Sequence, residues 1–218
     1  MGLNVQTGNM YGFVTHTWNT IKGECYHDCL YCYMKRYGKL KPIRFDEKEL
    51  KTDLGTGNFI FVGSSCDMFA KDVPIKWIDE TTNYCKQFDN QYLFQSKNPA
   101  RFYNCSFPKK TILATTIESN RMYSSVYSKA ITVNFRANLM AGLKYHQRMV
   151  TIEPIMDFDL EEFVELIDSI KPFQVNIGAD SKRHNLPEPS RQKVQELISE
   201  LKKFDMNIFL KDNLKRLQ

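Results

Sequence analysis

Short apolar segments rich in β-branched and aromatic residues alternate with helical patterns along this 218-residue chain. Strands are expected in seven of these segments, near 12–18, 58–63, 91–96, 111–117, 149–154, 173–178 and 206–211. Helices are expected near 75–88, 159–170 and 189–204, where apolar residues recur with the helical period. Strands that alternate with helices form a parallel sheet through crossover connections. The pattern therefore predicts an α/β fold with six or seven mostly parallel strands.

The number of strand–helix units limits the architecture. A complete eightfold barrel usually needs about 250 residues, whereas this chain has 218 residues and too few units. We therefore expect a partial (βα)6 TIM-like barrel. A doubly wound sheet is the competing architecture, which periodicity does not exclude. No repeat, low-complexity tract or linker interrupts the sequence, so residues 1–218 are expected to form a single domain.

Polar residues follow the expected strands at their carboxyl ends. In parallel barrels these ends meet at one rim, where binding and catalytic residues lie. Glu153, Asp180 and Lys211 fit either substrate contacts or ion pairs at such a rim. A purely structural barrel has no need for so many polar groups at one end. The groups expected to meet there are a cysteine-rich loop, Ser64, Ser65, Cys66, Asp67, Lys97, residues 118–121, Glu153, residues 180–182 and residues 211–213.

The loop after the first strand contains three cysteines within eight residues, Cys25, Cys29 and Cys32. Thiolates so close together can bind one metal centre, but a four-iron cluster is normally held by four cysteines. Three thiolates leave one coordination position open, which is typical of a catalytic rather than a structural metal site. The spacing therefore predicts a reactive metal centre.

Two other uses of these cysteines compete with an iron–sulfur cluster. Zinc in a Cys3His site would take its fourth ligand from His16 or His27. His27 lies between the first two cysteines, too close to fold back easily onto the same ion, whereas His16 precedes them and is freer. A disulfide is less favoured, because nothing in the sequence indicates an oxidising compartment. Aromatic Tyr31 before the third cysteine, together with the barrel pattern, favours iron and sulfur.

The composition is that of an ordinary globular protein, 42% hydrophobic and 25% charged with a net charge of +5. No apolar run is long enough to span a bilayer. The first residues resemble neither a secretory signal nor a myristoylation motif. A cytoplasmic, reducing location is therefore expected. Cys66, Cys85 and Cys105 are widely separated and form no second metal motif, so most are expected to be buried as small apolar side chains.

The pattern C-x3-C-x2-C with Tyr31 before the last cysteine resembles the signature of radical S-adenosylmethionine (SAM) enzymes. This resemblance implies a partial (βα)6 barrel in which Cys25, Cys29 and Cys32 hold a 4Fe–4S cluster and Tyr31 lies along the adenine of SAM. It also implies that SAM binds the fourth iron and is cleaved reductively to a 5′-deoxyadenosyl radical, which abstracts hydrogen from a substrate. An electron donor such as flavodoxin or ferredoxin is the implied partner.

Three further motifs resemble spore photoproduct lyase and a related group of small phage-type radical SAM proteins: GSSCD after the second strand, FQSKNP at the third and TTIESN at the fourth. The resemblance implies that Ser65 and Asp67, with Ser64 in the same stretch, lie near the SAM amine. It places Lys97 at the SAM carboxylate and Ser119 at the ribose. The chain departs from the wider family in having no Gly-Gly-Glu after the second strand. From the residues alone, Lys97 also fits a surface cation beside a turn and Ser119 a helix N-cap.

Cys66 has two interpretations. In spore photoproduct lyase a cysteine on this loop returns a hydrogen atom to the product radical, which implies a catalytic role for Cys66. That cysteine stands three residues before the aspartate, whereas Cys66 directly precedes Asp67. The offset would turn the thiol toward a different wall of the site. A buried structural thiol is the alternative.

A basic loop, KRYGKLKPIRF at 35–45, lies between the cysteines and the second strand. Its cations would follow a phosphate backbone, with Tyr37 or Phe45 stacking on a base. The alternative is a solvated loop, which the modest net charge of +5 favours. With the resemblance, a nucleobase, nucleotide or nucleic acid is the expected substrate, and the competing function is a noncatalytic zinc or iron–sulfur module that binds nucleic acid. Residues expected to extend the basic surface are Arg101, Lys109, Lys110, Arg121 and Arg148.

Overall fold

The computed structural model describes residues 2–6, 10–144, 147–182 and 184–218. Within them, the main sheet has eight strands in the order β1-β2-β5-β6-β7-β8-β9-β10. Neighbouring strands are parallel except for β1, which pairs antiparallel with β2 at one edge. The strands are β1 (Asn4–Val5), β2 (His16–Trp18), β5 (Phe59–Val62), β6 (Gln91–Gln95), β7 (Thr111–Thr116), β8 (Gln147–Ile152), β9 (Gln174–Ile177) and β10 (Asn207–Leu210).

The seven strands expected from the sequence are the seven parallel strands of this sheet, and only the edge strand β1 was not indicated by the pattern. Parallel strands of this sheet that are consecutive along the chain are also neighbours in the sheet. Ile60 therefore lies opposite Tyr92, and Ala114 lies opposite Met149. The sheet is open, because β10 pairs with β9 and not with β1 or β2. The α/β fold with a partial, unclosed barrel is therefore confirmed.

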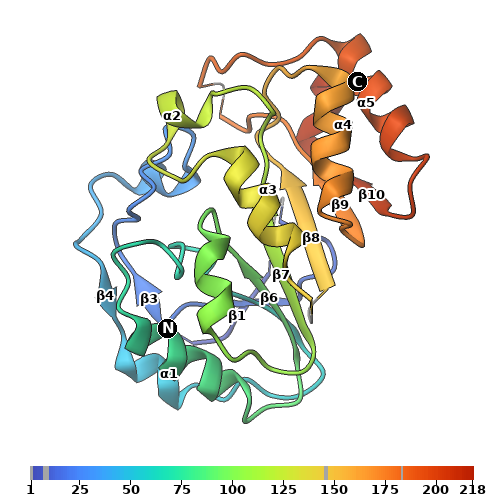
Figure 1. The fold of residues 1–218 in the computed structure, drawn as a ribbon. Helices are drawn as coiled ribbons and strands as arrows, with labels where there is room; N and C mark the ends of the chain where they lie inside the picture. Colours follow the sequence, from blue (N-terminus) through green and yellow to red (C-terminus); the bar gives the residue numbers. More distant parts are fainter. Residues whose placement is uncertain (1, 7–9, 145–146, 183) are drawn as a thin grey trace.

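Helices cover one face of the sheet (Figure 1). The four longer ones, α1, α3, α4 and α5, each connect two neighbouring parallel strands. Helices α1, α4 and α5 lie where the sequence predicts helices, whereas no sequence pattern predicts α3. Among the described residues, no helix combines the length and the apolar character needed to cross a membrane. The helices are α1 (Ile75–Cys85), α2 (Ser124–Tyr127), α3 (Val133–Ala141), α4 (Leu160–Ser169) and α5 (Arg191–Leu201).

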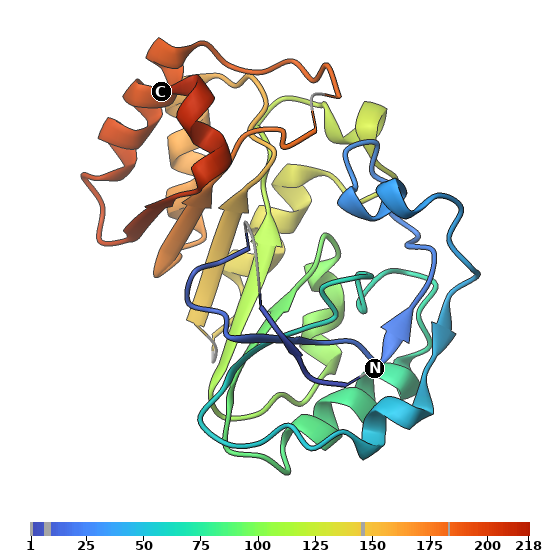
Figure 2. The ribbon, with the colours of Figure 1, turned by 180° about the vertical axis from the view of Figure 1, so that it is seen from behind.

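Alternate side chains of each strand pack on opposite faces of the sheet. On β5, Ile60 and Val62 are buried in the large core beneath the helices, while Phe61 between them belongs to a smaller core on the other face. Leu93 of β6 and Tyr11 of the N-terminal segment pack in the same smaller core. Figure 2 shows this segment crossing the sheet on the side away from the helices. Both faces are therefore covered, as buried parallel strands require.

A short antiparallel hairpin encloses the cysteine loop, with β3 (Ile21–Lys22) paired to β4 (Arg44–Phe45). Gly23 follows β3 with a φ of 114°, and a Cβ at this position would stand 2.5 Å from the carbonyl oxygen of Pro42. The Glu24 amide donates to the Lys41 carbonyl at 2.9 Å and joins the same two backbone segments. Glycine is needed here because two backbone segments approach closely. The 3-10 helices are η1 (Tyr33–Tyr37), η2 (Glu47–Lys51), η3 (Pro99–Asn104) and η4 (Asp212–Leu217).

Candidate active site

The carboxyl ends of the parallel strands border two adjoining cavities, of about 150 Å³ and about 530 Å³. Cys29, Cys32, Ser64 and Lys97 are among the residues that line both. The larger cavity continues past them to residues that follow β8, β9 and β10. The polar groups that the sequence places after the strands therefore meet largely at one composite site.

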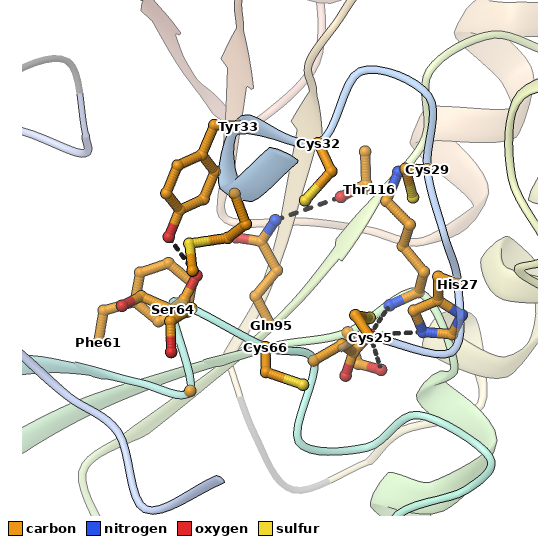
Figure 3. A pocket seen from close by; sticks show the side chains of 16 residues that line it. Cys25, His27, Cys29, Cys32, Tyr33, Phe61, Ser64, Cys66, Gln95 and Thr116 are labelled. Atoms are coloured by element: carbon orange, nitrogen blue, oxygen red, sulfur yellow. Dashed lines mark hydrogen bonds and ion pairs between the residues drawn. The ribbon is translucent and has the colours of Figure 1, made fainter. Parts of the chain in front are cut away.

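Three cysteine thiols lie on the wall of the smaller cavity, Cys25, Cys29 and Cys32 (Figure 3). All three are free. A hydrogen bond with the Cys66 thiol lowers the pKa of Cys25 to about 7, which favours the thiolate form that binds metals. In the described part of the chain, no three His, Cys, Asp or Glu side chains already stand close enough together to hold a metal ion. The thiols would have to turn toward one another to bind a shared centre.

The donor set on this wall fits an iron–sulfur cluster better than it fits zinc. Three thiols facing a common space are the soft ligands that iron–sulfur clusters use. The zinc alternative needs a fourth protein ligand, and His16 lines neither cavity and hydrogen-bonds to Thr15 Oγ1 at 2.9 Å. His27 does line the smaller cavity, but it lies between Cys25 and Cys29 in the chain, too close to fold back easily onto the same ion.

The cysteine loop is held from outside by the last residue of α2 and the segment that follows it. The Leu30 amide donates to the Tyr127 carbonyl at 2.8 Å, and the Lys129 amide donates to the His27 carbonyl at 2.7 Å. Ser128 Oγ lies 3.3 Å from Cys29 Sγ and donates to the His27 carbonyl at 3.2 Å. These contacts fix the backbone on both sides of Cys29, which a shared metal centre would require.

Asp67 connects the loop after β5 to the cysteine loop. Its Oδ2 accepts hydrogen bonds from His27 Nε2 at 2.8 Å, Ser96 Oγ at 2.9 Å and the Lys97 amide at 2.8 Å, and its Oδ1 accepts from the Phe69 amide at 2.9 Å. Burial alone would raise the pKa of Asp67, but His27 and the two amides hold it below its ordinary value. The carboxylate that the resemblance places near the SAM amine is thus occupied by donors of the chain itself.

Lys97 belongs to a buried network that the sequence shows only in part. Its Nζ pairs with Glu118 Oε1 and donates to Tyr31 Oη at 2.6 Å, and it lies 4.5 Å from the centre of the Tyr31 ring. Arg136 from α3 pairs with the other Glu118 oxygen at 2.9 Å. Burial alone would lower the pKa of Lys97, but Cys29 and Glu118 raise it above its ordinary value. The lysine therefore remains charged beside the thiols.

Ser64 and Ser65 are positioned by two side chains outside their own loop. Asn19 Oδ1 accepts from the Ser65 amide at 2.9 Å and from Ser64 Oγ at 3.3 Å. Tyr33 donates its hydroxyl to the Ser64 carbonyl at 2.8 Å, a contact visible in Figure 3. Ser64 lines both cavities and Ser65 only the smaller one. Neither Asn19 nor Tyr33 has a sequence pattern that would single it out.

Ser119 and Cys66, two further residues singled out by the sequence, do not line the larger cavity. Ser119 lines neither cavity; its Oγ donates to the Asp157 carbonyl at 2.6 Å and accepts from the Arg121 amide at 3.0 Å, which stabilises a turn. Cys66 is buried on the wall of the smaller cavity, where its thiol contacts Cys25 and lies 3.7 Å from the Glu24 carbonyl oxygen.

The far wall of the larger cavity consists of residues that follow β8, β9 and β10. Lys211 pairs with Glu153 at 2.6 Å, and Asn213 donates to the same carboxylate at 2.9 Å. Asp180 pairs with His184 at 2.7 Å. The ion pairs that were one of two interpretations for Glu153, Asp180 and Lys211 are therefore present, on a wall that also faces the cavity.

The basic loop contributes one residue to the larger cavity, Arg36, whose guanidinium lies 5.6 Å and 4.6 Å from the rings of Tyr33 and Tyr37. Tyr37 is exposed. Four of the five residues expected to extend this basic surface are engaged by other groups. Arg101 donates to the Ala70 and Val73 carbonyls, and Arg148 donates to the Ala141 carbonyl. Lys110 pairs with Asp89, and Arg121 pairs with Asp157 and Asp159.

No family model and no curated protein matches the sequence. Among solved structures, the chain is similar to a mutant of spore photoproduct lyase with bound AdoMet and dinucleoside spore photoproduct, with a TM-score of 0.68 and 10% identity over 96% of this chain and 80% of that one. Spore photoproduct lyase complexed with dinucleoside spore photoproduct gives a TM-score of 0.67 and 10% identity over 94% and 78%. Identity this low shows a shared fold, and it is the fold that the cysteine motif led us to expect.

Proposed function

We propose that this protein is a radical SAM enzyme that binds a 4Fe–4S cluster through Cys25, Cys29 and Cys32. The observation that carries the proposal is the position of these thiols on one cavity wall at the carboxyl ends of the parallel strands. The fold shared with spore photoproduct lyase supports it. When bound, the cluster and SAM would supply a 5′-deoxyadenosyl radical that takes a hydrogen atom from the substrate.

The chain's own residues would hold these groups in place. In this proposal Lys97 binds the SAM carboxylate, because it is a charged, largely enclosed lysine that lines both cavities. Ser64 and Ser65 offer small polar groups for the amine, and Tyr31 lies along the adenine. Asp67 acts indirectly, because its carboxylate fixes His27 and thereby positions the cysteine loop. Ser119 also acts indirectly, by stabilising the turn that follows β7.

The larger cavity has a size that suits a small-molecule substrate. Its volume of about 530 Å³ is within the range of small-molecule sites, roughly 300–1,000 Å³. Tyr11 and Phe61, which line it, also belong to the smaller core beneath the sheet. Phe61 contributes an apolar surface to the floor of this cavity, and the Tyr11 hydroxyl is held by a hydrogen bond that it donates to Gln95 Oε1 at 2.6 Å.

A nucleobase, nucleotide or nucleic acid is the proposed substrate class. Arg36 at the cavity and exposed Tyr37 beside it provide a cation and a stacking surface. The similar structures of spore photoproduct lyase contain dinucleoside spore photoproduct. A flavodoxin or ferredoxin remains the proposed electron donor.

The hydrogen-atom role of Cys66 stays a prediction. Its thiol lines the smaller cavity and contacts Cys25, and it is not among the residues that line the larger one. This position favours a supporting role beside the cysteine loop over direct contact with a substrate in the larger cavity.

Anaerobic reconstitution with iron and sulfide tests the proposal. We expect about four irons and four sulfides per chain, and SAM binding that requires this cluster. Cys25→Ala and Cys32→Ala should lose both, while Cys105→Ala, whose thiol bonds to the Arg101 carbonyl at a distance from the site, should retain them. A colourless protein that binds one zinc and no SAM would contradict the proposal.

A further inference from the structure

The loop after β9 carries a carboxylate–imidazole pair on the far wall of the larger cavity. Asp180 is buried, with 4% of its surface exposed. Its Oδ1 lies 2.7 Å from His184 Nδ1 and accepts from the Lys182 amide at 3.1 Å, and its Oδ2 accepts from the His184 amide. Arg216 donates to the Asp180 carbonyl at 2.9 Å. These bonds leave the imidazole little freedom to rotate.

This arrangement leaves the second ring nitrogen of His184 available to a ligand. Because Asp180 accepts the Nδ1 proton, Nε2 is the atom that can bond to something else. His184 lines the larger cavity, and 22% of its side chain is exposed. No residue of the described chain hydrogen-bonds to Nε2. The structure therefore offers a fixed, accessible imidazole nitrogen with no protein partner in the described residues.

The charges around this wall are unbalanced in favour of cations. Glu153 is neutralised by Lys211 at 2.6 Å, and Glu118 is shared by the two cations Lys97 and Arg136. Asp180 adds one negative charge beside His184. Lys182 and Arg36 line the same cavity, and neither forms an ion pair with any described residue. Two cations without ion-pair partners and an imidazole on the lining of one cavity favour an anion over a neutral ligand.

We propose that His184, held by Asp180 and assisted by Lys182 and Arg36, forms a subsite for a phosphate group. A phosphate on Nε2 and Asp180 on Nδ1 would stabilise the imidazolium between two anions, so that it donates a charge-assisted hydrogen bond to each. A phosphate also has enough oxygens to accept from the lysine and the guanidinium at the same time. That this phosphate belongs to the substrate rests on the function proposed above, whereas binding of phosphate itself does not.

Nuclear magnetic resonance of the imidazole nitrogens tests this subsite in the full chain without iron or SAM. The chain contains four histidines, and the signals lost in His184→Gln identify those of His184. We expect its neutral form to carry the proton on Nδ1. Titration with inorganic phosphate, against sodium chloride at equal ionic strength, should shift the Nε2 signal of His184 and leave His16 on β2 unaffected.

Variants separate a specific subsite from general attraction to a basic surface. His184→Gln should weaken phosphate binding about tenfold or more, the usual loss for one charge-assisted hydrogen bond. Asp180→Asn, which keeps an acceptor but loses the charge, should weaken it less and alter the tautomer of His184. The matched control His16→Gln should bind phosphate normally. Equal phosphate shifts at His16 and His184, or unchanged binding by His184→Gln, would overturn the subsite.

The two proposals fail in different ways. If the chain assembles no cluster but phosphate shifts His184 and is lost in His184→Gln, the phosphate subsite stands and the radical function does not. If the cluster forms and SAM binds while phosphate leaves His184 unchanged, the radical function stands and the subsite is wrong.

Discussion

His27 Nε2 lies 2.8 Å from Asp67 Oδ2, and this hydrogen bond joins the cysteine loop to the loop that follows β5. Both partners are largely buried, with 4% and 11% of their side chains exposed. The same Asp67 oxygen also accepts from Ser96 and from the Lys97 amide. One carboxylate thus holds together three segments that border the smaller cavity.

Replacing Asp67 with alanine should loosen the cysteine loop before any cofactor is added. Asp67→Ala leaves His27 and two amides without their buried acceptor, so we expect a loss of about 3 kcal/mol in the free energy of unfolding. Backbone amides at 25–32 should also exchange hydrogen faster. Urea denaturation and hydrogen exchange measure both effects. In the control Asp212→Ala, an exposed carboxylate is removed, and equal stability of the two variants would contradict this role for Asp67.

Glu118 makes stability depend on pH in the acid range. Burial would raise its pKa, but Arg136 and Lys97 hold it well below the ordinary value of 4.5. Its contribution is therefore fully present above about pH 4.5 and is lost as the pH falls toward the lower pKa of the folded state. Glu118→Gln should cost about 3–5 kcal/mol at neutral pH, because Arg136 is left buried and unpaired.

The test compares urea denaturation of the wild type and Glu118→Gln from neutral pH down to about pH 4 and below. The stability gap between them should narrow as the pH falls below 4.5, since the wild type then loses the contribution that the variant never had. A gap that stays constant over this range would mean that Glu118 is not held as the charged partner of Arg136 and Lys97.

Strands β5 to β9 could be predicted from the sequence because each is a short, mainly apolar run that is largely buried. Strand β10 is also a mainly apolar run, although most of its residues are exposed. Helices α1, α4 and α5 could be predicted because they present one apolar stripe to the sheet. Helix α3 could not, because Arg136 occupies its buried face between Val133 and Met140. A buried ion pair interrupts the apolar period, and its partner Glu118 lies on another element.

The cysteines and Lys97 could be identified from motifs, whereas their supports could not. His27, Asn19 and Arg136 contact the site through side chains whose partners are far along the chain. Such contacts have no local spacing. His184 follows Asp180 by four residues, but outside a helix this spacing carries no signal.

The smaller core, which lies beneath the larger cavity, is expected to contribute strongly to the free energy of unfolding. Leu93 is fully buried there between the sheet and the N-terminal segment. Leu93→Ala should therefore cost about 2–5 kcal/mol and increase hydrogen exchange at residues 10–14. Val5→Ala, at a side chain that is 72% exposed, should change stability by less than about 0.5 kcal/mol. Equal effects would show that the N-terminal segment does not pack on Leu93.

Gly23 should tolerate no side chain, since a Cβ would press on the backbone of Lys41 and Pro42. Gly23→Ala is expected to cost more than the roughly 1–2 kcal/mol of backbone strain alone. Gly38 has a positive φ of 76° but open space around it, so Gly38→Ala measures the cost of backbone strain without a steric clash. Thermal unfolding of both variants measures the difference. A Gly23 variant no less stable than the Gly38 variant would contradict the close approach of the two segments.

Release of 5′-deoxyadenosine by the anaerobically reconstituted chain, supplied with SAM and dithionite, tests the proposed function most directly. We expect the wild type and Cys105→Ala to form this product and Cys29→Ala to form none. A chain that carries its full complement of iron and sulfide, binds SAM, and still releases no 5′-deoxyadenosine would contradict a radical SAM function.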